Sequence, residues 1–147
     1  MRISLTRLRA IFAGLAALPL AACATYPTLA ERASMLAPAM QYYAPAQAGP
    51  APLVIMASGC GGLNGLEGPK PIIANYAKAA TAAGAYVVVF DSFGPRGLGF
   101  SDSVTWVCSG LRLRGDARAG DIIAAEALAR QHWNRAFTGV ILAGWSH

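Results

Sequence analysis

One stretch of the chain decides its fold class: Leu53-Val54-Ile55-Met56-Ala57, followed at once by Ser58-Gly59-Cys60-Gly61-Gly62. A continuous apolar run of this kind is typical of a strand buried on both faces, as strands in parallel sheets are. The glycines that follow allow the backbone to leave the sheet in a tight loop. The stretch therefore predicts a central strand with a glycine-rich loop at its carboxyl end.

Two further apolar runs repeat this pattern, at residues 86–90 and 139–143. With helical spacing between them, the order strand, helix, strand, helix, strand predicts an α/β fold. Its sheet is expected to be mostly parallel, with right-handed crossovers and helices on both faces. Ligands of such sheets bind beyond the carboxyl ends of the strands. We therefore expect the functional residues in the segments that follow the three strands.

A packed helix is predicted after the first strand, because apolar side chains recur there at helical spacing: Ile72, Ile73, Tyr76, Ala77 and Ala80. Gly84 is expected to end this helix in the left-handed conformation. Asp116 is the expected N-cap of a second helix that runs to about His132, with Glu126 and Arg130 as an i,i+4 pair. Residues 91–114 are expected to form a long loop, and residues 40–43 a short edge strand.

Residues 1–22 have the organisation of a bacterial signal peptide, with a basic start and an apolar segment too short to span a bilayer. The sequence Leu20-Ala21-Ala22-Cys23 resembles a lipobox, in which the Cys23 thiol would receive a diacylglycerol. Cleavage after Ala24 is the alternative. We expect a protein of the periplasm or outer membrane, anchored through Cys23, or a secreted one if the lipobox is not used. Residues 23–50 are then a tether, apart from the edge strand.

The net charge of +5 does not indicate a nucleic-acid partner. Arg2, Arg7 and Arg9 supply three of these charges from within the signal peptide. The rest of the chain has nine Lys and Arg against seven Asp and Glu, a net charge of +2. That balance is ordinary for a protein surface.

The third strand leads into Gly144-Trp145-Ser146-His147. A serine hydroxyl is a weak nucleophile, and α/β-hydrolases present it on a tight turn between a strand and a helix. Small residues two positions before and after the serine permit this turn, and Gly144 occupies the first of these positions. We expect Ser146 to be a nucleophile, with the chain ending inside its elbow. A turn without chemistry is the simpler alternative.

The loop at residues 58–62 is the expected source of one oxyanion-hole donor, the backbone N–H of Cys60 or Gly61. The second donor would be the N–H of His147, the residue after the nucleophile. The loop fits neither common nucleotide-binding pattern. A dinucleotide fingerprint would need a glycine where Asn64 stands, and residues 68–71 lack the Gly-Lys-Ser/Thr of a P-loop.

These motifs resemble the dienelactone-hydrolase family of α/β-hydrolases over residues 53–147. The most specific of them is Asp91-Ser92-Phe93-Gly94-Pro95-Arg96-Gly97 after the second strand, followed by Val107-Cys108 and Arg114-x-Asp116-Ala117. The resemblance implies hydrolysis of an ester or lactone by a nucleophile–His–Asp triad, with no metal or organic cofactor. Ser58-Gly59 replaces the family's His-Gly, and a serine replaces the nucleophilic cysteine, which favours a general carboxylic ester.

In this family the triad acid and histidine follow the nucleophile along the chain. Residues 51–147 are therefore expected to be the N-terminal half of a hydrolase domain, truncated at the elbow and inactive alone. His132 is expected at a helix end, Asp91 to brace its loop, and Arg96 to bond nearby carbonyls rather than a substrate carboxylate. The alternative function is that of a non-catalytic, lipid-anchored binding or structural lipoprotein.

Cys60 and Cys108 are the two remaining cysteines. An exported chain lives in an oxidising compartment, where a remaining pair of cysteines tends to form a disulfide. Two separate buried thiols are the alternative.

Overall fold

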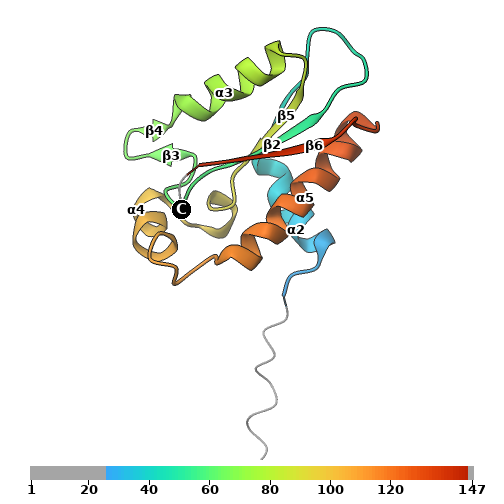
Figure 1. The fold of residues 1–147 in the computed structure, drawn as a ribbon. Coiled ribbons are helices and arrows are strands. Elements are labelled where there is room, and N and C mark those ends of the chain that lie inside the picture. The colour runs from blue at the N-terminus through green and yellow to red at the C-terminus, as the bar shows by residue number, and fades with distance from the viewer. Residues whose placement is uncertain (1–25, 146–147) are drawn as a thin grey trace, which may run out of the picture.

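Strand β2 (Leu53–Ala57) lies inside a four-stranded sheet of order β1-β5-β2-β6 (Figure 1). A computed structural model describes residues 26–145 of the chain. The predictions for the signal peptide, Cys23, Ser146 and His147 lie outside the described residues.

The neighbours of β2 run parallel to it, in register. Ala57, its last residue, lies opposite the last residue of β5 (Tyr86–Phe90) and the last of β6 (Val140–Gly144). β1 (Met40–Tyr43) pairs antiparallel with the outer side of β5, which confirms the predicted edge strand. The chain thus has a mixed α/β fold with a mostly parallel sheet, as its alternating pattern predicted.

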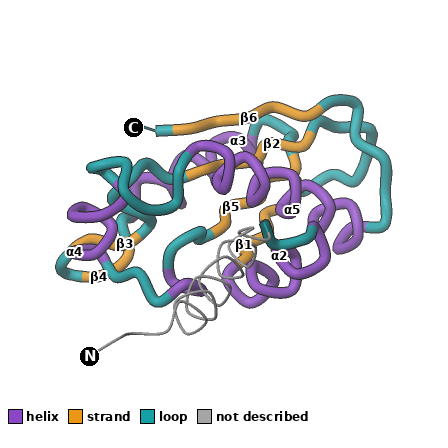
Figure 2. The backbone as a smooth tube through the Cα atoms, turned by 90° about the horizontal axis from the view of Figure 1, so that it is seen from below, coloured by secondary structure: helices purple, strands orange, loops and turns teal. Residues whose placement is uncertain are grey.

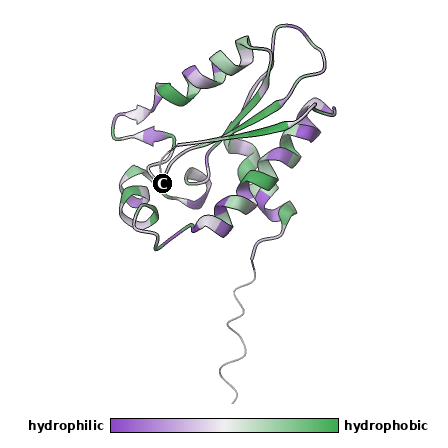
Figure 3. Ribbon diagram, viewed as in Figure 1, coloured by the Kyte–Doolittle hydropathy of each residue, from purple (hydrophilic) through white to green (hydrophobic). Residues whose placement is uncertain are grey.

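Helices cover both faces of the sheet (Figures 1 and 3). Alternate residues of β2 point to opposite faces, as the pleat of a strand requires. Leu53 and Ile55 pack toward α5 (Gly115–Trp133) and α2 (Leu29–Leu36). Val54 and Met56 pack toward α3 (Pro71–Ala82). This two-sided packing explains why the strand is continuously apolar.

Helix α3 begins at a proline, and Gly84 follows its end with φ +95°, as predicted. The apolar stripe is narrower than expected. Ile73 and Ala77 are buried, but Ile72 and Tyr76 are 51% and 47% exposed. Only one edge of the stripe therefore meets the sheet within the described residues.

Helix α5 begins two residues earlier than predicted. Arg114 is its N-cap residue and has extended backbone, so Asp116 lies in the first turn and is not the N-cap. A carboxylate there still interacts favourably with the amino end of the helix dipole. The helix ends at Trp133, followed by Asn134 in the left-handed conformation. The predicted Glu126–Arg130 pair is confirmed, with 2.7 Å between the Arg130 Nη2 and Glu126 Oε1 atoms.

The predicted tether is wrong for residues 29–39, which form α2 and a short 3-10 helix. Thr28 and Glu31 close a capping box at the start of α2. Leu36 is fully buried and Arg32 is 6% exposed, because α2 packs against α5. The segment is thus part of the domain, held by contacts with residues distant in the sequence.

Residues 91–114 are not an unstructured loop. They contain a 3-10 turn (Gly94–Arg96), a short helix α4 (Phe100–Asp102) and a π-helical turn (Ser103–Val107). These turns enclose a small apolar cluster of Phe93, Leu98 and Val107. A two-stranded hairpin, β3 (Asn64–Gly65) and β4 (Gly68–Pro69), lies between β2 and α3. Among the described helices, none has the length and apolarity needed to cross a bilayer.

Candidate active site

The carboxyl ends of β2, β5 and β6 meet at one edge of the sheet, because the three strands end in register. Beyond them lies a cavity of about 370 Å³, bordered by Ser58, Cys60, Arg118, Gly144 and Trp145. The glycine-rich loop and the residues directly before Ser146 therefore share one cavity, as predicted. The position of Ser146 itself is outside the described residues.

The loop after β2 turns sharply at its end. The Gly62 N–H donates to the Gly59 carbonyl over 3.0 Å, and Gly62 has φ +71°. A Cβ at this position would lie 2.6 Å from the Cδ2 atom of Phe93. Residue 62 must therefore be glycine, both for its backbone angle and for its close approach to the segment after β5.

Two cations hold the carbonyl groups of this loop. The Lys70 Nζ atom donates to the carbonyls of Gly61 and Gly62, each over 3.2 Å. The Arg118 guanidinium donates to the Ser58 carbonyl. Within residues 26–145, the amides of Cys60 and Gly61 donate no hydrogen bond. Free backbone N–H groups with positive charge behind them are the arrangement that stabilises a developing oxyanion.

Cys60 and Cys108 are joined in a disulfide, which confirms the predicted pair. The bond ties the glycine-rich loop to the end of the π-helical turn, 48 residues along the chain. Val107, next to Cys108, is 1% exposed and also borders the cavity. The loop is thus fixed by a covalent bond as well as by Lys70 and Arg118.

Asp91 braces the segment after β5, as predicted. Its Oδ1 atom accepts from the Phe93 N–H over 2.8 Å, and its Oδ2 atom accepts from the Gly94 N–H over 3.2 Å. A Cβ on Gly94 would come within 2.7 Å of Oδ2. Asp102 braces α4 in a similar way, accepting from the Gly99 N–H. Neither carboxylate is therefore free to serve as a catalytic acid in this geometry.

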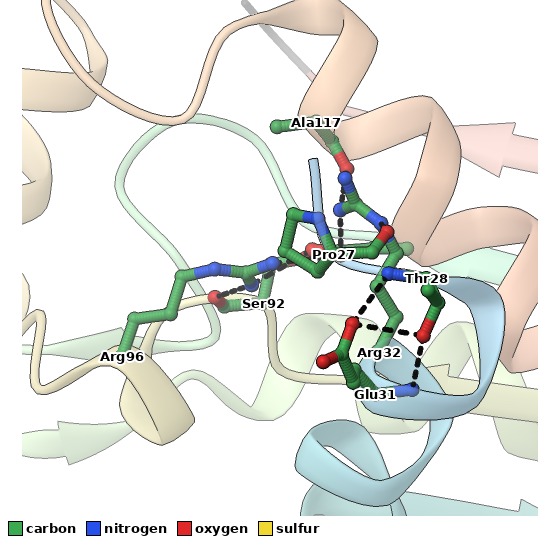
Figure 4. Close-up of polar contacts among 8 residues, drawn as sticks. Pro27, Thr28, Glu31, Arg32, Ser92, Arg96 and Ala117 are labelled. Atoms are coloured by element: carbon green, nitrogen blue, oxygen red, sulfur yellow. Dashed lines mark hydrogen bonds and ion pairs between the residues drawn. The ribbon is translucent and has the colours of Figure 1, made fainter. Parts of the chain in front are cut away.

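Arg96 does not border this cavity, and its guanidinium donates to the Ser92 carbonyl, as predicted (Figure 4). Its two terminal nitrogens also donate hydrogen bonds to the two oxygens of the Asp121 carboxylate, each over 2.8 Å. Asp121 is fully buried, and Arg32 of α2 donates to the same carboxylate over 3.1 Å. This Arg32–Asp121–Arg96 triad links α2, α5 and the segment after β5. Arg32 and Asp121 are not predicted from the sequence, where the one available signal is an acidic residue among the alanines of α5.

Arg118 was also missed. It lies near the start of α5. Because a crossover helix follows the carboxyl end of the preceding strand, this position in the sequence was the available signal that Arg118 lies near the strand ends. Desolvation lowers the pKa of Arg118, the Asp121 charge opposes this, and the Arg96 charge lowers the pKa further. Its Nη1 atom and the Ser58 hydroxyl are buried without a hydrogen-bond partner in the described part of the chain. The cavity wall therefore contains unsatisfied hydrogen-bonding groups.

His132 lies far from this cavity. Its ring stacks on Tyr42, with 3.8 Å between the ring centroids, near the end of α5. It is 17 residues from Gly115 of the same helix, or about 26 Å at 1.5 Å per residue. The predicted surface or helix-end position is confirmed. Over residues 26–145, His, Cys, Asp and Glu side chains form no cluster that would hold a metal ion.

Neither a protein-family model nor a curated protein nor a solved structure matches this chain. The described residues offer free amides, two nearby cations and the strand end that leads to Ser146. Such a set can polarise a carbonyl group and stabilise a negative charge on its oxygen.

Proposed function

We propose that this chain contains the nucleophile half of a serine hydrolase of the α/β-hydrolase type, acting on carboxylic esters or lactones. The register of β6 carries this proposal. Gly144 lies opposite Ala57, so the chain that continues through Trp145 leaves the sheet beside the glycine-rich loop. Ser146 is the next residue along the chain, and the proposal assigns it the attack on an acyl carbonyl bound at the loop amides.

In the proposed reaction the Ser146 Oγ atom attacks the carbonyl carbon and loses its proton to a general base. The oxyanion formed accepts hydrogen bonds from the His147 N–H and from the Cys60 or Gly61 N–H. Collapse of this intermediate expels the protonated alcohol and leaves an acyl-serine. Water then attacks the acyl-serine by the same route, which releases the carboxylic acid and restores Ser146.

We further propose that the base and its acid partner come from outside residues 26–145. His132 is too distant, and Asp91, Asp102 and Asp121 are all committed to structural hydrogen bonds. In this fold type the acid and histidine follow the nucleophile in chain order. The 147-residue chain alone is then expected to be inactive or nearly so.

The proposed location is the periplasmic side of a bacterial membrane, with Cys23 acylated as the anchor. The lipobox-like sequence before Cys23 supports this, and so does the Cys60–Cys108 disulfide, because such bonds persist in oxidising compartments. Mass spectrometry of the mature N-terminus tests it directly. A diacylglycerol-modified Cys23 is expected, and an unmodified N-terminus at Thr25 would contradict the anchor.

The activity is tested by hydrolysis of p-nitrophenyl acetate and butyrate. The complete product of the gene is compared with the 147-residue chain. We expect turnover by the former that falls by at least about a thousandfold in Ser146→Ala, since the nucleophile is then absent. Ser101→Ala is the matched control, because Ser101 is exposed and lies outside the cavity. Full activity in Ser146→Ala, or Ser146-dependent turnover by the 147-residue chain, would contradict the proposal.

A further inference from the structure

The segment 103–115 displays apolar side chains to solvent on a rigid frame. Val104, Trp106 and Leu111 are 46%, 43% and 68% exposed. Arg112 and Arg114 are exposed beside them, and the segment contains no acidic residue. Large exposed apolar side chains gathered in one place indicate an interaction surface rather than an ordinary exterior.

Hydrogen bonds and the disulfide fix this segment. The backbone N–H groups of Leu111 and Arg112 both donate to the Trp106 carbonyl, over 3.0 and 2.9 Å. Val107 is buried beneath it, and Cys108 is bonded to Cys60. The exposed side chains are thus displayed by a well-anchored turn, which has already lost the conformational entropy that docking would otherwise remove.

The beginning of the described chain lies against this segment. Tyr26 and Pro27 line a hollow of about 260 Å³ together with Arg112 and Leu113. Tyr26 is 70% exposed, and Leu29, in the first turn of α2, is 50% exposed. Figure 1 shows the start of α2 and the link from α4 to α5 on the lower side of the molecule, and Figure 2 views that side directly.

The covalent chain leaves little distance between Cys23 and this surface. Tyr26 is three residues after Cys23, and an extended chain spans at most about 3.6 Å per residue, or about 11 Å in total. A lipid chain on Cys23 would therefore hold Tyr26 and its neighbours at the bilayer surface. Tryptophan, tyrosine and arginine are the residues that favour the interface between lipid and water.

We propose that Tyr26, Leu29, Val104, Trp106 and Leu111, flanked by Arg112 and Arg114, form a membrane-docking surface that rests on the lipid bilayer into which Cys23 is anchored. The exposed carboxylates of Asp102 and Asp116 flank the segment 103–115, and Glu31 lies in the first turn of α2. The contact therefore relies on its aromatic and aliphatic side chains, with the two arginines reaching the headgroups. This surface is separate from the hydrolytic proposal and rests on the anchor at Cys23.

The test places the acylated protein in vesicles of phosphatidylethanolamine and phosphatidylglycerol with brominated acyl chains, which quench tryptophan fluorescence at short range. Trp106→Phe isolates the contribution of Trp106. Trp133→Phe is the control, because Trp133 packs with Tyr86 and Phe137 at the other end of α5. We expect about twofold quenching of the Trp106 emission, as for a side chain seated at the interface, and little of the Trp133 emission.

A second pair of variants guards against misfolding. Leu111→Asp places a charge in the surface and is expected to remove the Trp106 quenching. Ile72→Asp, at an exposed position on α3 across the sheet, is expected to leave it unchanged. Absence of Trp106 quenching overturns the proposal, as does a Leu111→Asp protein that is still quenched. The mass of the Cys23 peptide reports the anchor separately, and ester hydrolysis is scored in its own assay.

Discussion

Strands β2 and β6 have similar apolar sequences and adjoin in the same sheet, yet their surroundings differ. Each residue of β2 from Leu53 to Met56 is buried between two parallel neighbours and two layers of helix. In β6, Val140, Ile141 and Leu142 are 38%, 51% and 61% exposed, and the strand pairs on one side only within the described residues.

The segments that follow these strands differ in the same way. The loop after β2 is held by a disulfide, by Lys70 and by Arg118. After β6, Trp145 stacks on the half-exposed Tyr76, with 5.5 Å between the ring centroids, and packs against the edge of the apolar cluster on the α3 face. The glycine-rich loop is therefore held by several contacts among the described residues, whereas the end of β6 is held by fewer of them.

The largest expected effect is at the buried triad, on the well-packed side of this comparison. Asp121→Ala leaves Arg32 and Arg96 without their shared carboxylate, and an unpaired buried charge destabilises a fold by about 4 kcal/mol. Urea denaturation followed by circular dichroism measures the loss. The control is Glu126→Ala, which breaks a surface pair with Arg130 and is expected to cost at most about 0.5 kcal/mol. Equal effects of the two variants would show that the triad does not hold the fold together.

The disulfide comes next. Replacing Cys60 and Cys108 together by serine frees a long chain segment, and the expected loss is about 3 kcal/mol of unfolding free energy. The glycine-rich loop should also become more mobile, which amide hydrogen exchange of residues 59–62 detects. If the variant were as stable as the wild type and its loop amides exchanged as slowly, the disulfide would not be what holds the glycine-rich loop in place.

A matched pair of substitutions then compares the two strands themselves. Ile55 and Leu142 are direct neighbours across β2 and β6, but Ile55 is 1% exposed and Leu142 is 61% exposed. Ile55→Ala is expected to lower the unfolding free energy by about 3 kcal/mol, because it opens a cavity in the core. Leu142→Ala is expected to lower it by about 0.5 kcal/mol in the 147-residue chain. Equal destabilisation by the two substitutions would show that the Leu142 side chain is buried in solution, which would contradict the contrast between a buried β2 and an exposed β6.

The smallest expected effect is at the start of α2. Thr28→Ala removes the cap and should cost about 1 kcal/mol at neutral pH. The bonds from Thr28 lower the pKa of Glu31. A lowered carboxylate pKa contributes stability above the unfolded-state pKa that is lost as pH falls through the folded-state value. The stability difference between wild type and Glu31→Gln should therefore shrink between about pH 5 and pH 3, whereas an unchanged difference would exclude the charged capping box.

Local sequence patterns were sufficient to predict the strands, their mostly parallel arrangement and the meeting of their carboxyl ends at one edge of the sheet. Continuous apolar runs and alternating periodicity depend on neighbouring residues only, so they can be predicted from sequence alone. The triad could not be predicted in this way. Arg32 meets Asp121 across 89 residues, and a single polar residue in a helix does not reveal its partner. For the same reason the sequence predicts a tether where α2 lies, because the burial of α2 depends on α5.

The cap of α5 shows a second limit. Asp116 has the residue type of an N-cap, but the extended backbone of the cap falls at Arg114, so Asp116 lies inside the first turn of the helix. Arg118 marks a third limit. Its residue type is ordinary on a helix surface, and only the packed structure shows that it is part desolvated and bonded to Ser58. Residue types at element ends are predictable, whereas the contacts they make depend on the assembled fold.

The most direct test of the central claim is covalent labelling with a fluorophosphonate, which reacts with an activated serine and not with an ordinary one. The complete gene product is labelled in its folded state and in urea, and the adduct is located by peptide mass spectrometry. The account predicts one adduct, on Ser146, that disappears in urea. No adduct on the folded protein, or an adduct at Ser58, Ser92 or another serine in place of Ser146, would contradict it.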